Sequence, residues 1–245
     1  MDTVIIGIHG LRNKPPKDLL ADWWKKSIVE GFQAFQLPVL EFDFEMAYWA
    51  HYLNSKPQDG SITDTKDPQF LEEPYEPGTN FGPRDPNPFK KNISIGIHKQ
   101  IFQLIAGKSA FMNIEAVSNI ILHRMFVELD IYYHHDIPDE QGRSRPAKEI
   151  LREELAGYLS RHAGKKILIL AHSMGSIIAY DVLMHTVPDI PVQTLITFGA
   201  PLGFPVITTK IKHELNLDPK SDDLLPTPPS LKGKWLNFSD LDDVT

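Results

Sequence analysis

The order of hydrophobic and polar positions along the chain predicts an α/β protein. Nearly continuous apolar runs, typical of buried parallel strands, cover residues 4–8, 166–170, 192–198 and 234–238, and a partly alternating run covers 39–49. Apolar residues at helical spacing lie between these runs, over residues 18–35, 143–164 and 174–185. Residues 204–229 have a weaker pattern that predicts no element. Because strands and helices alternate, we expect a mostly parallel central sheet with helices on both faces.

One long stretch departs from this alternation. Residues 54–92 hold seven of the 20 prolines and three of the 15 glycines, without sustained periodicity. Two helical stretches with unusually large apolar surfaces follow, over 93–106 and 113–129. Because the strands resume afterwards in the same style, we expect one domain over residues 1–245, with residues 54–130 inserted as a helical cap or lid.

Composition and charge exclude several classes of function. With a formal net charge of −7, the chain of 245 residues offers no basic surface for nucleic acid. The absence of cysteine excludes disulfides, thiolate metal ligands and a cysteine nucleophile. The first apolar run lacks a basic flank, and no apolar run approaches about 18 residues. We therefore expect no signal peptide, no integral membrane segment and a cytoplasmic location.

The stretch "AHSMG", residues 171–175, stands between a predicted strand and a predicted helix. A serine held in a sharp turn of this kind adopts strained backbone angles, so the residues two positions before and after it must be small. Ala171 and Gly175 meet this requirement around Ser173. The pattern indicates a nucleophilic serine, and the alternative is a serine that only caps the helix.

Two backbone amides are candidates for stabilising an oxyanion beside this serine. The N–H of Met174 opens the helix, where unpaired amides and the helix dipole favour negative charge. His9 and Gly10 end the first predicted strand, and the carboxyl ends of parallel strands meet at one edge of a sheet. We therefore expect the N–H of Leu11 to be the second donor.

Four segments together resemble the α/β-hydrolase superfamily, in particular its lipase- and esterase-like members. They are "VIIGIHGL" as first strand and oxyanion loop, "ILILAHSMGS" as nucleophile elbow, "LITFGAPLG" as the next strand, and "WLNFSDLDDV" as the strand and loop that bear the acid. The resemblance implies that His9 and Gly10 support the oxyanion loop and that His172 points away from the turn. Ala171 replaces the family's commoner glycine, which is sterically acceptable.

The resemblance also implies a catalytic acid and then a catalytic histidine after the serine. The family's acid turn corresponds best to Asp242, with Asp240 and Asp243 as alternatives and a solvated, inert acidic tail as a further one. The family's histidine follows the acid, yet no histidine follows His213. We therefore expect either a longer protein with a histidine beyond Thr245 or a degenerate hydrolase.

The other histidines offer no better base. His9 and His172 do not fit that role, and the scattered ones are expected at surface or core positions: His51, His98, His123, His162, His185 and His213. The segment "YYHHD", residues 132–136, could bind a metal together with a distant carboxylate. Adjacent histidines in a helix point in different directions, so we expect a helix end there instead. We expect neither a metal nor an organic cofactor.

The insertion suggests a class of substrate. If its helices cover the serine, the acyl pocket would be lined by apolar side chains, with Tyr48 and Trp49 at its rim: Ile97, Ile101, Leu104, Ile121 and Met125. Arg12 and Lys14 at the oxyanion loop would meet either an anionic head group or solvent. The alternative is that these side chains simply pack on the sheet.

These features predict a serine hydrolase that cleaves a carboxylic ester through an acyl-enzyme on Ser173. Its expected partner is a small-molecule ester with an apolar acyl or alkyl group. Two alternatives stay open: a catalytically degenerate α/β-hydrolase-like protein that binds a ligand or partner, and an acyltransferase on the same scaffold.

Overall fold

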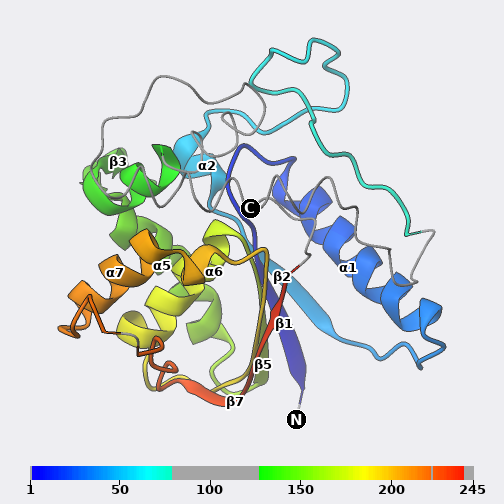
Figure 1. The fold of residues 1–245 in the computed structure, drawn as a ribbon. Coiled ribbons are helices and arrows are strands. Elements are labelled where there is room, and N and C mark those ends of the chain that lie inside the picture. Colours follow the sequence, from blue (N-terminus) through cyan, green and yellow to red (C-terminus); the bar gives the residue numbers. More distant parts are fainter. Residues whose placement is uncertain (1, 79–126, 222, 240–245) are drawn as a thin grey trace, which may run out of the picture.

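The computed structural model describes residues 2–78, 127–221 and 223–239, and its centre is a five-stranded sheet (Figure 1). Neighbouring strands pair in parallel, in the order β2–β1–β5–β6–β7. This confirms the predicted α/β class and the parallel sheet. The strands span Thr3–Ile8 (β1), Asp43–Ala47 (β2), Lys166–His172 (β5), Val192–Phe198 (β6) and Leu231–Phe238 (β7).

Helices lie on both faces of the sheet, as the sequence predicts (Figure 1). On one face is α1, whose Trp24 ring contacts the rings of Phe44 and Phe198, with centroids 6.3 and 5.4 Å apart. On the other face are α5, α6 and α7. The helical segments are α1 (Lys17–Ala34), α2 (Ala50–Leu53), residues 127–134, α5 (Ala147–Arg161), α6 (Met174–Asp181), the π-helical η1 (Val182–Thr186), the 3-10 turn η2 (Pro201–Gly203) and α7 (Pro205–Glu214).

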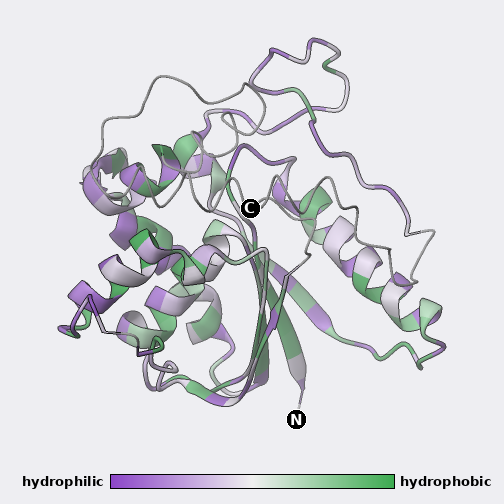
Figure 2. Cartoon of the chain, in the orientation of Figure 1, coloured by the Kyte–Doolittle hydropathy of each residue, from purple (hydrophilic) through white to green (hydrophobic). Residues whose placement is uncertain are grey.

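The core explains why continuous apolar runs became strands. Figure 2 shows hydrophobic residues concentrated along the strands, while the helices carry hydrophilic residues on their outer sides. A parallel strand covered by helices on both faces buries successive side chains alternately above and below the sheet, so both sets must be apolar. Side chains with no exposed surface come from strands and helices alike: Ile6, Ile8, Leu155, Ile169 and Ile177.

The sheet changes its direction of growth at β1. After β1 the chain adds β2 on one side, and β5, β6 and β7 extend the sheet on the other side. The ends of β1 and β5 are direct neighbours, since Ile8 pairs with Ala171. The helices that follow these two strands, α1 and α6, depart to opposite faces (Figure 1). Such a point forms a crevice at the carboxyl ends of the strands, where ligands of α/β proteins bind.

The strand predicted over residues 39–49 is shorter than expected. It spans only Asp43–Ala47, and residues 39–42 have no regular structure. The reason is the length of its neighbour: β2 pairs with β1 alone among the described strands, and that ladder begins where Val4 meets Asp43. In this register residues 39–41 lie beyond the first residue of β1, Thr3, and therefore have no described strand to pair with.

The last strand is longer than expected, because β7 begins at Leu231 and not at Lys234. Gly233 makes this possible. A Cβ atom at Gly233 would stand 2.0 Å from the carbonyl oxygen of Gln193 on β6, so only glycine allows the two strands to approach this closely.

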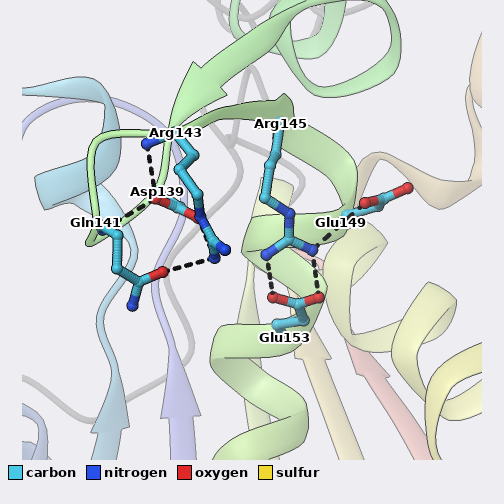
Figure 3. Close-up of polar contacts among 6 residues, drawn as sticks. All are labelled: Asp139, Gln141, Arg143, Arg145, Glu149 and Glu153. Carbon is cyan, nitrogen blue, oxygen red and sulfur yellow. Dashed lines mark hydrogen bonds and ion pairs between the residues drawn. The ribbon is translucent and has the colours of Figure 1, made fainter.

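The helix predicted over residues 143–164 begins only at Ala147, because an antiparallel hairpin takes up its first residues. The turn of that hairpin is held by Asp139, whose carboxylate accepts the backbone N–H groups of Gln141 and Arg143, each at 2.9 Å (Figure 3). Gly142 supplies a φ of 74° in the same turn. The hairpin consists of β3 (Asp136–Pro138) and β4 (Ser144–Pro146).

Helix α7 lies in the segment from which no element is predicted. The sequence features that favour this helix are few. They are Pro205 at the first helical position, the buried Ile207 and Ile211 four residues apart, and basic residues in the last turn. With so short an apolar stripe, packing against the rest of the core is needed to stabilise the helix.

Most of the predicted insertion, residues 79–126, lies outside the described residues. Its described first part, residues 54–78, is irregular, with one isolated bridge between Asp59 and Phe70. Residues 127–134 are helical, so helical structure continues past the predicted end at Leu129. In the described ranges, no helix is both long and apolar enough to cross a membrane.

Candidate functional site

Ser173 occupies a strained turn between β5 and α6. Its backbone angles, φ 49° and ψ −124°, lie in a region that residues other than glycine rarely adopt. The turn is held by backbone hydrogen bonds: the Ser173 N–H donates to the Phe198 carbonyl at 3.0 Å, and the Ser176 hydroxyl donates to the Ser173 carbonyl at 2.6 Å. The Ser173 side chain is buried, and its hydroxyl makes no hydrogen bond with any other described residue.

Two glycines allow the serine turn to lie directly against the end of β1. A Cβ atom on Gly175 would stand 2.6 Å from the carbonyl oxygen of Ile8 and 2.7 Å from that of His9. A Cβ atom on Gly10 would stand 2.8 Å from the Cβ of Ser173. The sequence predicts that position 175 must be small, and the structure shows that the atoms nearest to it are the backbone carbonyls of Ile8 and His9, at the end of β1.

His9 is fixed within the loop that follows β1. Its Nε2 lies 3.1 Å from the Trp49 amide and 3.3 Å from the Ala50 amide, so Nε2 accepts and Nδ1 carries the proton. That Nδ1 donates to the Gly10 carbonyl at 2.8 Å. Burial lowers the pKa of His9 to about 3, so the imidazole is neutral at physiological pH. With both nitrogens committed, His9 packs the loop and is not placed to serve as a base.

The two predicted oxyanion donors come from the two segments that meet at the carboxyl ends of β1 and β5. Leu11 follows Gly10, which packs on Ser173, and Met174 is the first residue of α6. Among the described residues, neither amide N–H donates a hydrogen bond. Ala171 is fully buried at the end of β5, beneath the turn. The structure thus leaves two unpaired amides beside the serine.

Tyr48 and Trp49 do not form the rim of a pocket. Both side chains are buried, and Trp49 is only 1% exposed. The Trp49 ring stacks on His9 with centroids 4.7 Å apart, and its Nε1 donates to the His9 carbonyl at 3.0 Å. These aromatic residues therefore support the loop after β1 from inside the core.

Arg12 and Lys14 do not simply point into solvent. The Arg12 guanidinium pairs with Glu72 at 2.6 Å. Burial lowers the pKa of Lys14, and the nearby carboxylates of Glu73 and Glu128 oppose that shift. These acidic residues belong to the described segments 54–78 and 127–134, so the two cations connect both segments to the loop after β1. Nothing in the sequence near Leu11 pointed to Glu128, because it lies more than 100 positions away.

Further hydrogen bonds join the same two segments. The side-chain amide of Asn13 donates to the carbonyls of Lys56 and Pro68 at 2.9 and 3.1 Å. The Gln58 N–H donates to the Lys14 carbonyl at 2.8 Å. Residues 54–78 therefore lie against the candidate site, at the carboxyl edge of the sheet (Figure 1).

No described histidine forms a hydrogen bond with the Ser173 hydroxyl. The His172 ring stacks on Phe198 with centroids 5.0 Å apart, and its Nδ1 would lie 2.9 Å from a Cβ on Gly10. His51 and His213 are exposed, His162 pairs with Glu45 at 2.6 Å, and burial lowers the pKa of His185 in η1. His98 and His123 lie outside the described residues.

The strand that leads to the predicted acid is well anchored on β6. The Thr197 hydroxyl donates to the Asn237 side-chain oxygen at 2.8 Å, and Trp235 Nε1 donates to Thr197 at 3.1 Å. Asp242 and its alternatives Asp240 and Asp243 lie beyond the end of the described residues. The residues predicted to line an acyl pocket also lie outside them: Ile97, Ile101, Leu104, Ile121 and Met125.

His134 and His135 end the helical stretch 127–134, as expected for "YYHHD". The two imidazole rings nevertheless point to the same carboxylate: His134 and His135 each contact one oxygen of Asp130, at 2.9 and 2.8 Å. His134 also accepts a hydrogen bond from Lys210 at 3.0 Å. Within the described ranges, no group of three or more histidine or acidic side chains is arranged to hold a metal ion.

Comparisons with protein-family models, with curated proteins and with solved structures gave no match to this chain. Its function therefore has to be argued from the geometry of the site.

Proposed function

We propose that this protein is a serine hydrolase of the α/β-hydrolase type that cleaves a carboxylic ester. The observation that carries the proposal is the backbone of Ser173, which is held at φ 49° in a strand-to-helix turn at the point where the sheet reverses its growth. Strain at a single polar residue in such a crevice is typical of catalytic nucleophiles.

Each step of acyl transfer has a candidate group. The Ser173 hydroxyl attacks the ester carbonyl carbon while a base takes its proton, and the carbonyl oxygen becomes an oxyanion. The unpaired amides of Leu11 and Met174 stabilise that oxyanion. Collapse of the tetrahedral intermediate expels the alcohol, which takes the proton, and leaves the acyl group on Ser173. Water then repeats the sequence and releases the carboxylic acid.

The remaining members of the catalytic machinery are assigned by resemblance alone. Asp242 is the proposed acid, and it would orient a histidine base that the described residues do not supply. An apolar acyl or alkyl group is the proposed substrate class, because the insertion that borders the site is rich in apolar side chains. Water could also give way to another acceptor, which would make the protein an acyltransferase.

The proposal is tested with p-nitrophenyl esters of increasing acyl length. The purified protein should release p-nitrophenol in a burst of about one equivalent followed by steady turnover, because an acyl-enzyme accumulates on reactive esters. Ser173→Ala should abolish both phases. Ser160→Ala, which removes an exposed hydroxyl from α5, is the matched control and should behave like the wild type. Absence of any Ser173-dependent turnover would favour the non-catalytic binding protein instead.

A further inference from the structure

The residue after the second oxyanion donor has an unusual backbone. Arg12 has φ 73°, in the left-handed region that costs a side-chain-bearing residue on the order of 1 kcal/mol. Such a conformation persists only where neighbouring contacts enforce it. The contacts made by the Arg12 backbone therefore control how the preceding residue, Leu11, is presented.

The backbone contact that holds Arg12 comes from Glu128. Both carboxylate oxygens of Glu128 accept the Arg12 N–H, at 2.9 and 3.1 Å. A hydrogen bond from an amide to a charged carboxylate is about twice as strong as one between neutral groups. The Arg12 side chain has a separate partner, since its guanidinium donates to Glu72 at 2.6 Å. Glu128 thus fixes the backbone, whereas Glu72 fixes only the side chain.

Leu11 lies between two fixed points. On its N-terminal side, Gly10 packs against Ser173 and His172 so closely that a Cβ on Gly10 would stand within 2.9 Å of both side chains. On its C-terminal side, the Arg12 amide is bound by Glu128. The Glu128 carboxylate also occupies the Arg12 amide and leaves the Leu11 amide unpaired among the described residues.

We propose that Glu128 is a positioning residue that holds the Leu11 amide in place to stabilise the oxyanion. The proposal rests on the proposed function, because it assigns Glu128 a role in that same site. Glu128 touches no reacting atom and acts through the Arg12 and Leu11 backbone. It belongs to the segment that closes the predicted insertion, so the insertion would contribute to the chemistry and not only cover the site.

The test measures labelling of the full chain by a fluorophosphonate together with hydrogen exchange of residues 10–15. Glu128→Ala should lower the maximal labelling rate about tenfold, because a displaced donor weakens transition-state stabilisation. The fluorophosphonate concentration at half-maximal rate should change less than about twofold, because ground-state binding is untouched. Exchange of residues 10–15 should accelerate. Glu128→Gln keeps a carbonyl acceptor and should restore most of the rate.

The matched control is Glu72→Ala, which removes the partner of the Arg12 side chain without touching the backbone bond. It should label like the wild type. If hydrogen exchange of residues 10–15 accelerates in Glu128→Ala while the labelling rate stays unchanged, the proposal is overturned. It is also overturned if hydrogen exchange of these residues does not change. Equal loss of rate in Glu128→Gln and Glu128→Ala would also overturn it. A folded wild type that takes no label would defeat the proposed function itself, which is a different result from labelling that ignores Glu128.

Discussion

Among the turns in which a described residue has a positive φ, two make a useful comparison because they use different residues. The hairpin between β3 and β4 uses Gly142 at φ 74°, where a Cβ would meet no atom within 4 Å, and Asp139 satisfies the neighbouring amides (Figure 3). The turn between β5 and α6 uses Ser173 at φ 49°, where glycine would cost less strain.

The proposed function accounts for the difference, because it requires a hydroxyl at Ser173 and requires nothing of Gly142. At Gly142 the chain uses the residue that conformational freedom favours. At Ser173 the chain keeps a serine in a strained backbone conformation. The serine hydroxyl forms no hydrogen bond with any other described residue, so it does not stabilise that conformation. The surroundings must therefore stabilise the strained turn, and the close approach of Gly175 and Gly10 to their neighbours is how they do it.

The largest effect that follows is on Gly175. Gly175→Ala should destabilise the fold by about 3 kcal/mol, because its Cβ would overlap carbonyl oxygens of β1. Gly157→Ala is the control: in α5 the new methyl would be no closer than 3.8 Å to another atom, and it should stabilise by about 0.5–1 kcal/mol. Urea unfolding measures both. Equal effects would contradict the claim that packing on β1 holds the serine turn.

Acid should loosen the loop that faces the serine turn. The pKa of His9 is about 3 in the folded state against an ordinary value of 6.5, so the unfolded chain binds the proton more tightly. The stability that neutral His9 contributes is present above pH 6.5 and is lost as the pH falls toward 3. Between pH 7 and pH 5 the free energy of unfolding should fall by about 2 kcal/mol from His9 alone.

His9→Asn keeps an acceptor but removes this titration. Urea unfolding at pH 5, 6 and 7 should therefore show a shallower pH dependence for the variant than for the wild type. Parallel pH curves for the two proteins would mean that His9 is not the buried neutral group described above.

Substitutions at the two positive-φ positions should have opposite effects on stability. Ser173→Gly should stabilise by about 1 kcal/mol, since strain at a sparsely populated φ is relieved. Gly142→Ala should destabilise by about 1 kcal/mol for the opposite reason. Thermal and urea unfolding of both variants check these signs. A Ser173→Gly variant that is less stable than the wild type would show that the serine is needed for folding.

The smallest effect concerns the ion pairs beside the hairpin. Arg145 contacts Glu153 through two hydrogen bonds of 2.9 and 2.6 Å (Figure 3). The Glu153 side chain is mostly exposed, so solvent screens the pair. Arg145→Gln should lower the free energy of unfolding by about 0.5 kcal/mol or less. A larger loss would mean that the hairpin turn depends on its ion pairs and not on Asp139 and Gly142.

The serine turn could be predicted from the sequence because its determinants are local. A buried apolar run, a small residue on each side of Ser173 and an apolar helix all fall within about 20 residues, and each has its own steric reason. The parallel sheet was predictable for a similar reason, since strands buried on both faces must be apolar throughout.

The contacts that hold the loop after β1 could not be predicted, because they come from distant parts of the chain. The His9 ring is bound by amides 40 and 41 positions away, and the Arg12 amide by a carboxylate 116 positions away. No local pattern carries such contacts. The start of α5 was missed because Arg143 to Pro146 also fit a hairpin, which only pairing with Asp136–Pro138 stabilises.

The central claim is that Ser173 is an activated nucleophile, and one measurement tests it most directly. The folded protein is treated with a fluorophosphonate, its intact mass is recorded, and the modified peptide is mapped. We predict one phosphonyl group per chain, on Ser173, absent from Ser173→Ala and retained in Ser160→Ala. A folded wild-type protein that takes no label, or takes it on another residue, would contradict the account and favour the non-catalytic binding protein.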